Sequence, residues 1–372
     1  MNEELLLSQC DWSFPVPIAY GPGRLREMGG YATTLGLTKP LIVTDQGSAE
    51  LPFIDTLQQA LLSAGIGSEV FAEVAPNPRD SDIVLARKAY LEGGHDSVIA
   101  IGGGSGMDAG KSTALTAHNE CDIWQFDFDR EVPSLPTGHV FPKLICIPTT
   151  AGTGAETEST AMVTHSERGM KLCVWHPELK PSLTLLDPEI TLGLPAALTA
   201  WTGIDAMVHA IEAYCVPDYH PMCDGVALEA LRLIGRWLPL AVEEPGNLVA
   251  RGGMQVGACL AGVSFLKGLG LVHAISHMVG ADFDTHHGLT NAIVLPAVLK
   301  FNAPAINEKL PAMCDALGLQ SVDFESFYAV ICQLLDRLSV PVTLAEIGVP
   351  ADAARNLAEK AHQDAAAGTN PR

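Results

Sequence analysis

The sequence predicts an α/β dinucleotide-binding domain with a mostly parallel, Rossmann-like sheet, followed by an all-α metal-binding domain. Three observations support this prediction: apolar runs that alternate with helical patterns in the first half, a glycine-rich turn after one of those runs, and helix-borne histidines in the second half. A chain of 372 residues is also long for a single ordinary core. We expect the first domain to comprise residues 1–190 and the second residues 191–372.

The first half alternates short β-rich runs with helix-like stretches. The candidate strands are Pro40–Thr44, Ser97–Ile101 and Leu144–Ile147, and the helical stretches include Thr56–Ala64 and Ile83–Glu92. Such alternation predicts a mostly parallel sheet covered by helices. From about Pro195 onward, helical periodicities follow one another and β-branched runs become rare, which predicts a helical domain.

The stretch SVIAIGGGSGMDAGKS places three glycines directly after a candidate buried strand. Gly102–Gly104 would allow a tight turn, and Met107–Ala117 is expected to form a helix with Asp108 in its first turn or at its cap. The free N–H groups and the dipole at such a helix start favour a phosphate. A plain glycine turn without a ligand is the structural alternative.

The GKS at the end of this stretch resembles an ATP-binding P-loop. Five residues separate Gly104 from Gly110, however, where the P-loop has four. Lys111 and Ser112 are also expected to lie a full turn inside the helix. A P-loop phosphotransferase therefore stays as an alternative from a different functional class, as does a non-catalytic metal-binding module.

Two further segments are expected at the same edge of the sheet. Asp45 follows the first candidate strand, where a carboxylate can bind a ribose 2′-hydroxyl and repel a 2′-phosphate, which favours NAD over NADP. Asp45 precedes the glycine loop by about sixty residues, whereas the usual acid follows it by about twenty, so the domain must be a Rossmann variant. The stretch IPTTAGTGAETES follows the third strand, and a nucleotide cradle or a solvated loop would both explain it.

Histidines and an aspartate recur at helical spacing in the second half. Asp205 and His209 are four residues apart, as are His273 and His277, and four of the twelve histidines lie within residues 273–287. Residues four apart share one face of a helix. Two such pairs predict a metal site, with a satisfied polar core as the structural alternative.

The predicted donor set contains one carboxylate and three imidazoles. It comprises Asp205, His209, His273 and one of His286 or His287. This chemistry suits Fe²⁺ or Zn²⁺, with a coordination position left open for substrate. Such an ion polarises a carbonyl or stabilises an alkoxide. Glu212 shares the helix face of His209, and we expect it to be structural.

Composition restricts the partners. A net charge of −21 argues against nucleic acid and anionic membranes as partners. Nine cysteines without a C-x-x-C pair predict free thiols in a reducing compartment. The acidic N-terminus does not resemble a signal peptide, and no uninterrupted apolar run has the length of a membrane span. We therefore expect a cytoplasmic protein.

In combination, GGGSGMDAGK, PTTAGTGAE, GIDAMVHAIEAY and H-x-x-x-H followed by HHG resemble the iron-containing (group III) alcohol dehydrogenases over nearly the whole chain. The resemblance implies reversible hydride transfer between a small alcohol or aldehyde and NAD(P), with a metal polarising the substrate oxygen. It implies Fe²⁺, with Zn²⁺ or another divalent ion possible, and a homodimer or larger homo-oligomer. A zinc-dependent, glycerol-dehydrogenase-like polyol oxidoreductase is the nearest alternative.

The resemblance also assigns roles by position. The implied metal ligands are Asp205, His209, His273 and His287, which leaves His286 outside the ligand set. His277 is implied to lie close to the metal and is our candidate proton relay. The implied cofactor-binding residues are Asp45, Asn77, Gly103, Gly104, Ser105, Thr149, Thr150 and Lys171. Lys267 is expected to be a packing or solvated side chain, with a substrate contact as the alternative.

Overall fold

A computed structural model describes residues 10–12 and 15–372 of the chain. The chain divides into two compact units, each described here by itself. Unit 1 comprises Met1–Thr149 and Ala155–Thr191, and unit 2 comprises Thr150–Gly154 and Leu192–Arg372.

Unit 1 is built on a seven-stranded sheet with the order β1-β2-β9-β6-β5-β3-β4. Its strands are β1 (Cys10–Trp12), β2 (Ile18–Tyr20), β3 (Pro40–Asp45), β4 (Glu69–Val74), β5 (Ser97–Gly102), β6 (Lys143–Pro148) and β9 (Leu183–Leu186). Every pair is parallel except β1–β2, which confirms the mostly parallel sheet. A separate antiparallel hairpin consists of β7 (Thr160–His165) and β8 (Met170–Trp175).

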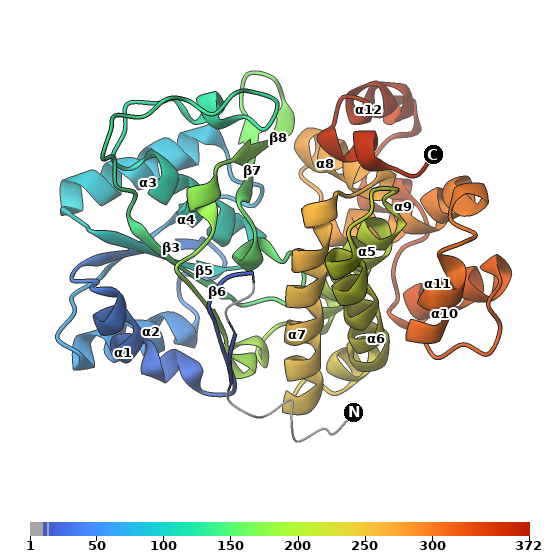
Figure 1. The fold of residues 1–372 in the computed structure, drawn as a ribbon, viewed down its shortest axis with the longest axis horizontal. Helices are drawn as coiled ribbons and strands as arrows, with labels where there is room; N and C mark the ends of the chain where they lie inside the picture. The colour runs from blue at the N-terminus through green and yellow to red at the C-terminus, as the bar shows by residue number, and fades with distance from the viewer. Residues whose placement is uncertain (1–9, 13–14) are drawn as a thin grey trace. The chain divides into compact units, whose positions relative to one another are not determined.

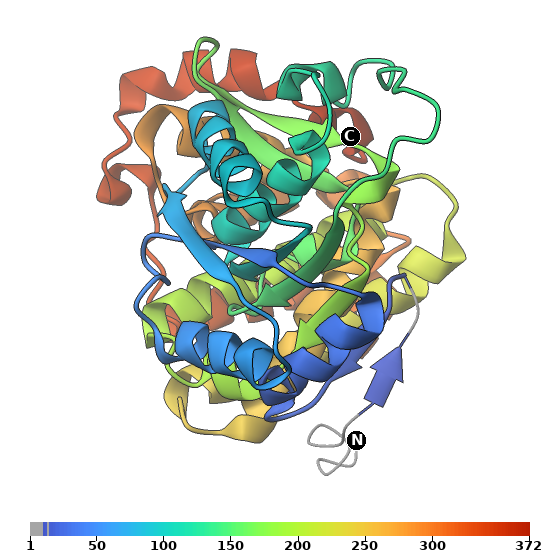
Figure 2. The ribbon, with the colours of Figure 1, turned by 90° about the vertical axis from the view of Figure 1, so that its left-hand side faces the viewer.

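Helices cover both faces of this sheet, and each face has its own apolar core. The helices are α1 (Met28–Leu35), α2 (Pro52–Ser63), α3 (Asp80–Gly93) and α4 (Gly104–Thr116). In β3, Leu41 and Val43 belong to one core, whereas Ile42 belongs to the other. This alternation is expected for parallel strands buried on both faces. Accordingly, α1 and α2 lie on one side of the strands and α3 and α4 on the other (Figures 1 and 2).

Helix α4 begins at Gly104, three residues before the predicted start at Met107. The prediction placed Asp108 in the first turn or at the cap, and this was wrong, because Asp108 lies in the second turn and is buried. Glycine and serine have low helix propensity, so sequence patterns shorten such a helix start. Burial raises the pKa of Asp108 to about 6.

Unit 2 is helical. Its helices are α5 (Ala196–Cys215), α6 (Pro221–Glu243), α7 (Leu248–Ser264), α8 (Leu271–Phe283), α9 (His287–Asn302), α10 (Leu310–Ala316), α11 (Phe324–Arg337) and α12 (Ala354–Ala361). Helices α5, α6 and α7 pack against one another. Among the described residues, only the stretch Leu248–Lys267 is long and apolar enough to cross a membrane, and 72% of its apolar window is buried inside the protein, as in a core helix.

The loop Thr150–Gly154 packs closely against helices of unit 2. A Cβ on Gly152 would lie 2.7 Å from the Cβ of Thr202 in α5, and one on Gly154 would lie 2.4 Å from the Cα of Gly262 in α7. Contacts under 3 Å leave no room for a side chain. Close packing therefore explains these two glycines, which belong to the stretch that the sequence suggested as either a nucleotide cradle or a solvated loop.

Candidate metal centre and dinucleotide-binding residues

Three helices of unit 2 carry the predicted metal-binding residues. Asp205 and His209 lie one turn apart in α5, a helix that is buried over most of its length. His273 lies in the first turn of α8, and His287 is the first residue of α9. Helix α9 packs against both α5 and α8, so tertiary packing brings together side chains that are distant in the sequence.

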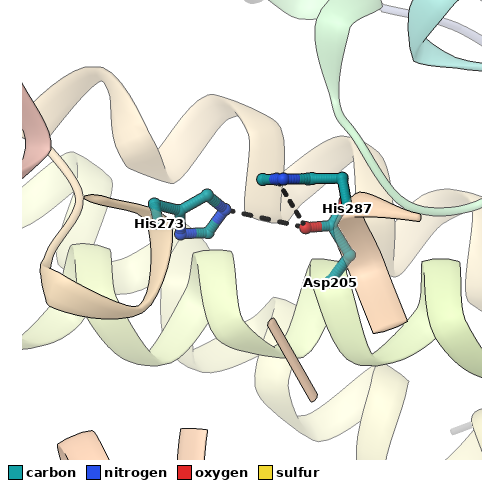
Figure 3. A group of neighbouring side chains, drawn as sticks. All are labelled: Asp205, His273 and His287. Atoms are coloured by element: carbon teal, nitrogen blue, oxygen red, sulfur yellow. Dashed lines mark ion pairs between the residues drawn. The ribbon is translucent and has the colours of Figure 1, made fainter. Parts of the chain in front are cut away.

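Asp205 Oδ1 is the common neighbour of the imidazoles. It lies 3.7 Å from His209 Nε2, 3.6 Å from His273 Nε2 and 3.5 Å from His287 Nε2. The donor atoms of Asp205, His273 and His287 all lie within 4.8 Å of one another, and the three side chains point toward a common centre (Figure 3). Donors bonded at about 2.1 Å to one tetrahedral ion would lie about 3.4 Å apart. The arrangement therefore fits a first-row divalent cation.

The electrostatics of this cluster also suit a cation. Burial raises the pKa of Asp205, but the surrounding histidines outweigh burial and hold that pKa well below its usual range. Burial lowers the pKa of His209 to about 4, so this ring is neutral near pH 7. Burial also acts to lower the pKa of His273, but Asp205 and Glu212 outweigh it and raise the pKa to about 9. A cation that binds His273 would therefore displace a proton.

Glu212 holds the ring of His273 in place. Its Oε2 lies 2.7 Å from His273 Nδ1, and its two oxygens accept the backbone N–H groups of Gly270 and Val272 at 3.0 and 2.7 Å. A carboxylate can only accept, so Nδ1 carries the proton and Nε2 faces Asp205. The sequence predicts that Glu212 is structural. The structure shows that it orients the ring of His273 at the candidate metal centre. Its position seven residues after Asp205, on the same helix face, was the available sequence signal.

Two polar residues that the sequence did not single out support the cluster. Ser276 Oγ lies 2.7 Å from His287 Nδ1, which leaves Nε2 toward the centre. Asn291, one turn after His287 in α9, donates from Nδ2 to Asp205 Oδ1 at 2.7 Å. The same nitrogen lies 3.3 Å from His273 Nε2 and 3.2 Å from His287 Nε2.

His277 lies beside the cluster and outside the group of converging donor atoms. Its ring is nearly parallel to that of His287, with centroids 5.3 Å apart and an interplanar angle of 12°. The centroid of His273 lies 5.9 Å away. On its other side, His277 Nδ1 lies 2.9 Å from Asp364 Oδ2.

Two further residues considered from the sequence have contacts of their own. His286 is the N-cap of α9, where its Nδ1 accepts the N–H of Leu289 at 3.4 Å. Lys267 is buried and donates to Asp224 Oδ1 at 2.6 Å. The burial of Lys267 and its ion pair with the partly buried Asp224 agree with the packing role expected for Lys267.

In unit 1, the glycine loop and Asp45 lie side by side. A Cβ on Gly102 would lie 2.8 Å from Asp45 Oδ2, and one on Gly106 would lie 3.4 Å from the same oxygen. The N–H of Thr149 donates to the carbonyl of Gly102 at 2.9 Å. Gly103 is the N-cap of α4, which begins with Gly104 and Ser105. These residues gather at the carboxyl ends of the neighbouring strands β3, β5 and β6.

Three predicted cofactor residues remain. Two of them, Asn77 and Lys171, contact each other, and the third, Thr150, lies in a loop. Lys171 Nζ, on β8, lies 3.3 Å from Asn77 Oδ1, and Asn77 has a positive φ of 53°. Thr150 belongs to the loop that groups with unit 2. Its hydroxyl oxygen is buried without a hydrogen-bond partner in the described part of the chain.

Lys111 and Ser112 lie well inside α4, as predicted. Lys111 is fully buried, and its ammonium group donates to the carbonyl of Ala155 at 2.7 Å. This side chain is therefore committed to the interior of unit 1, whereas a P-loop lysine must reach a phosphate. The contact argues against the phosphotransferase alternative.

Comparisons with known proteins cover both units. Residues 15–188 match the family model described as iron-containing alcohol dehydrogenase, and residues 199–372 match that of the C-terminal part of the Fe-containing alcohol dehydrogenase family. A 1,3-propanediol dehydrogenase of Klebsiella pneumoniae is 34% identical over 371 residues, covering 97% of this chain and 95% of the relative. An NAD-dependent methanol dehydrogenase of Bacillus methanolicus is 33% identical, covering 96% and 94%.

Solved structures of alcohol and 1,3-propanediol oxidoreductases are also similar to this chain. A crystal structure of a 1,3-propanediol oxidoreductase has a TM-score of 0.89 and 35% identity, covering 95% of this chain and 93% of the other. An alcohol dehydrogenase from Oenococcus oeni has the same TM-score of 0.89 and 33% identity, covering 95% and 94%. The relatives are named as 1,3-propanediol or alcohol dehydrogenases, and dehydrogenases belong to the oxidoreductase class of enzymes. The chain belongs to the iron-containing alcohol dehydrogenase family.

Proposed function

We propose that this protein is an NAD-linked, metal-dependent dehydrogenase that interconverts a small alcohol and its aldehyde or ketone. The metal ligands in this proposal are Asp205, His209, His273 and His287, and the ion is Fe²⁺ or Zn²⁺. One observation carries the proposal, namely that three imidazole nitrogens lie 3.5 to 3.7 Å from one buried carboxylate oxygen.

The side chains define what each part of the site would contribute. When bound, a divalent cation at this centre supplies Lewis acidity toward the substrate oxygen. Asp205 contributes negative charge, which favours binding of a cation over a neutral ligand. Glu212 and Ser276 hold the rings of His273 and His287 with Nε2 inward. His277 adjoins this group and is our candidate for accepting the alcohol proton.

Most residues of the proposed dinucleotide site belong to unit 1. The first N–H groups of α4, at Gly104 and Ser105, would bind a pyrophosphate, and the free donors of a helix N-terminus support this assignment. Asp45 adjoins this turn, where its carboxylate would accept a ribose hydroxyl and repel a 2′-phosphate. Asn77, Thr149, Thr150 and Lys171 complete the proposed set. The name of the Bacillus methanolicus relative, an NAD-dependent enzyme, supports NAD over NADP.

The proposed assembly, a homodimer or larger homo-oligomer, follows the family resemblance. The proposed compartment, the cytoplasm, follows from nine cysteines without a C-x-x-C pair. The substrate is proposed only as a small alcohol, in line with relatives named for 1,3-propanediol and methanol. A zinc-dependent polyol enzyme is the second candidate, because the same donor set also suits Zn²⁺.

The test is an anaerobic activity screen of the protein loaded with Fe²⁺ or Zn²⁺. Alcohols, diols and aldehydes are each offered with NAD(H) and NADP(H), and bound metal is measured in the same samples. We expect turnover with NAD(H) and about one metal ion per chain. The variant His287→Ala should lose most of the metal, because it removes a donor.

The matched control is His286→Ala, one residue earlier. Its imidazole caps a helix and is not a proposed ligand, so this variant should keep its metal content and turnover. Metal loss in both variants, or in neither, would overturn the ligand assignment. Absence of turnover with every substrate pair in metal-loaded protein would overturn the dehydrogenase, and a preference for NADP would remove the role given to Asp45.

A further inference from the structure

The C-terminal stretch Asp364–Arg372 is fastened to the helix that carries His273 and His277. Thr369 Oγ1 donates to the carbonyl of Leu269 at 2.8 Å, and Asn370 Oδ1 accepts the N–H of Leu271 at 3.2 Å. Asn370 and Asn302 also exchange two side-chain hydrogen bonds of 2.9 Å. The stretch is therefore held by hydrogen bonds to α8, to α9 and to Leu269 just before α8, and these bonds do not involve His277.

At the start of this stretch, each carboxylate oxygen of Asp364 has a hydrogen-bond partner. Its Oδ1 accepts the N–H of Ala366 at 2.8 Å and caps the short helix Ala365–Thr369. Its Oδ2 lies 2.9 Å from His277 Nδ1. Both side chains are 8% exposed, so water competes little for the pair.

This contact fixes how His277 is protonated. A carboxylate has no proton to donate when ionised. Burial acts to raise the pKa of Asp364, but the proximity of His277 and the hydrogen bonds from His277 and Ala366 outweigh it and hold that pKa below its usual value. The neutral ring must then carry its proton on Nδ1, which leaves the lone pair on Nε2. The face of this ring lies against His287, beside the candidate metal centre.

We infer that Asp364 is a positioning residue that holds His277 in the Nδ1–H form, with Nε2 as the atom that takes the proton of the substrate alcohol. The inference rests on the proposed function. In the oxidation direction, the alcohol O–H proton passes to Nε2 while the carbinol hydrogen leaves with its electron pair to the nicotinamide of NAD⁺. The products are the carbonyl compound, NADH and an imidazolium whose charge is balanced by the Asp364 carboxylate.

The substitution Asp364→Asn distinguishes this positioning role from a role in holding the C-terminal stretch in place. The backbone N–H of Ala366 needs an acceptor, so the amide oxygen of Asn should stay there and its NH₂ group should face His277 Nδ1. Two donors cannot share that contact unless the ring moves its proton to Nε2. The variant should therefore hold His277 in the wrong tautomer while keeping the packing.

We expect Asp364→Asn to lower kcat about 10- to 100-fold, within the range of general acid–base catalysis. KM should change less than about threefold and the metal content should not change, because no proposed ligand is altered. In the His277→Ala background, the same substitution should have less than about a twofold effect on kcat. Asp364→Glu, which keeps an acceptor, should restore much of the turnover.

A second readout does not depend on activity. In metal-free protein with ¹⁵N-labelled histidine, His277 should give the Nδ1–H pattern in the wild type and the Nε2–H pattern in Asp364→Asn. Its signal is assigned by its loss in His277→Ala. The matched control is Asp282→Asn. Asp282 lies on α8 and pairs with Lys360 of α12 at 2.5 Å, so its substitution removes a carboxylate that does not contact His277 and should leave tautomer and kcat unchanged.

The outcomes separate the inference from the proposed function. If His277→Ala lowers kcat but Asp364→Asn leaves both kcat and tautomer at wild-type values, the positioning role is wrong and the relay stands. Equal losses in Asp364→Asn and Asp282→Asn would reduce Asp364 to a structural tether and overturn the inference. If His277→Ala has no effect on turnover, the relay itself fails, and the inference with it.

Discussion

At the residue scale, the candidate centre depends on side chains that are not among its proposed ligands. Glu212 accepts three N–H groups, from His273 Nδ1 and from the backbone of Gly270 and Val272. The last two lie at the N-terminal end of α8, where N–H groups lack partners within the helix. One carboxylate thus fixes both the ring of a proposed ligand and the start of its helix.

We predict that Glu212→Gln weakens metal binding about 10- to 100-fold. Both oxygens of Glu212 accept backbone N–H groups, so an amide would have to oppose one of those donors with its NH₂ group and would shift the ring of His273. The measurement is a competition titration of Zn²⁺ against a chromogenic chelator. Glu229→Gln is the control, since Glu229 forms a half-exposed ion pair with Arg232 on α6. Equal Zn²⁺ affinity of Glu212→Gln and the wild type would contradict the orienting role.

The sequence predicted those site residues whose spacing follows a helix. Asp205 with His209, and His273 with His277, each share one helix face, as the four-residue spacing indicated. Asn291 and Asp364 were not singled out, because their contacts with Asp205 and His277 join residues 86 and 87 positions apart. Such contacts arise from the packing of α5, α8, α9 and the C-terminal stretch, which no local pattern encodes.

At the element scale, α4 shows how packing and motif chemistry share the same residues. Gly110 belongs to the stretch that resembles a P-loop, but its place is set by the sheet. A Cβ on Gly110 would lie 2.5 Å from the Cβ and 3.1 Å from the Cα of Ala100 in β5. Close approach of α4 to β5 therefore requires glycine here.

We predict that Gly110→Ala destabilises the protein by about 1–3 kcal/mol, the usual cost of overpacking. The clash involves Ala100, which has no flexible side chain to move aside, so it should outweigh the gain of about 1 kcal/mol in helix propensity. Urea unfolding gives the comparison. In Gly30→Ala, on α1, the new Cβ would have no neighbour within 4 Å, and we expect unchanged or increased stability. A Gly110→Ala protein as stable as Gly30→Ala would show that β5 and α4 can separate freely.

Elements buried on two faces were the easiest to predict. The predicted strands lie within β3, β5 and β6, which are nearly continuous apolar runs at the middle of the sheet. The strands β2 and β9 are only three and four residues long, and β4 buries only two of its six side chains. Short or half-exposed strands give weak patterns, and their pairing depends on distant partners.

At the scale of the whole molecule, the residues proposed to bind the metal and most of those proposed to bind the dinucleotide belong to different units. The proposed metal donors all belong to unit 2, whereas most proposed dinucleotide contacts belong to unit 1. The alternation of elements predicted an α/β part followed by a helical part, as in the relatives of known structure. The strand order could not be predicted, because β2 pairs with β9 across more than half of the α/β unit.

This separation predicts a localised effect of metal removal. A ligand that binds only the folded state stabilises it by about 4 kcal/mol when its concentration is 1,000 times its Kd. Chelation should therefore increase hydrogen exchange in peptides from α5, α8 and α9, which carry the proposed donors. Peptides from β3, β5 and β6 should keep their protection, because their contacts lie within the two cores of unit 1.

The measurement is hydrogen–deuterium exchange followed by mass spectrometry, with and without chelator. Asp205→Ala provides the control, because a protein that has lost its central carboxylate should respond little to the same treatment. Faster exchange in unit 1 equal to that in unit 2 would mean that the two units open together, contrary to the prediction. Unchanged exchange in α5, α8 and α9 on removal of a measured equivalent of metal would place that metal elsewhere than on the Asp205 cluster.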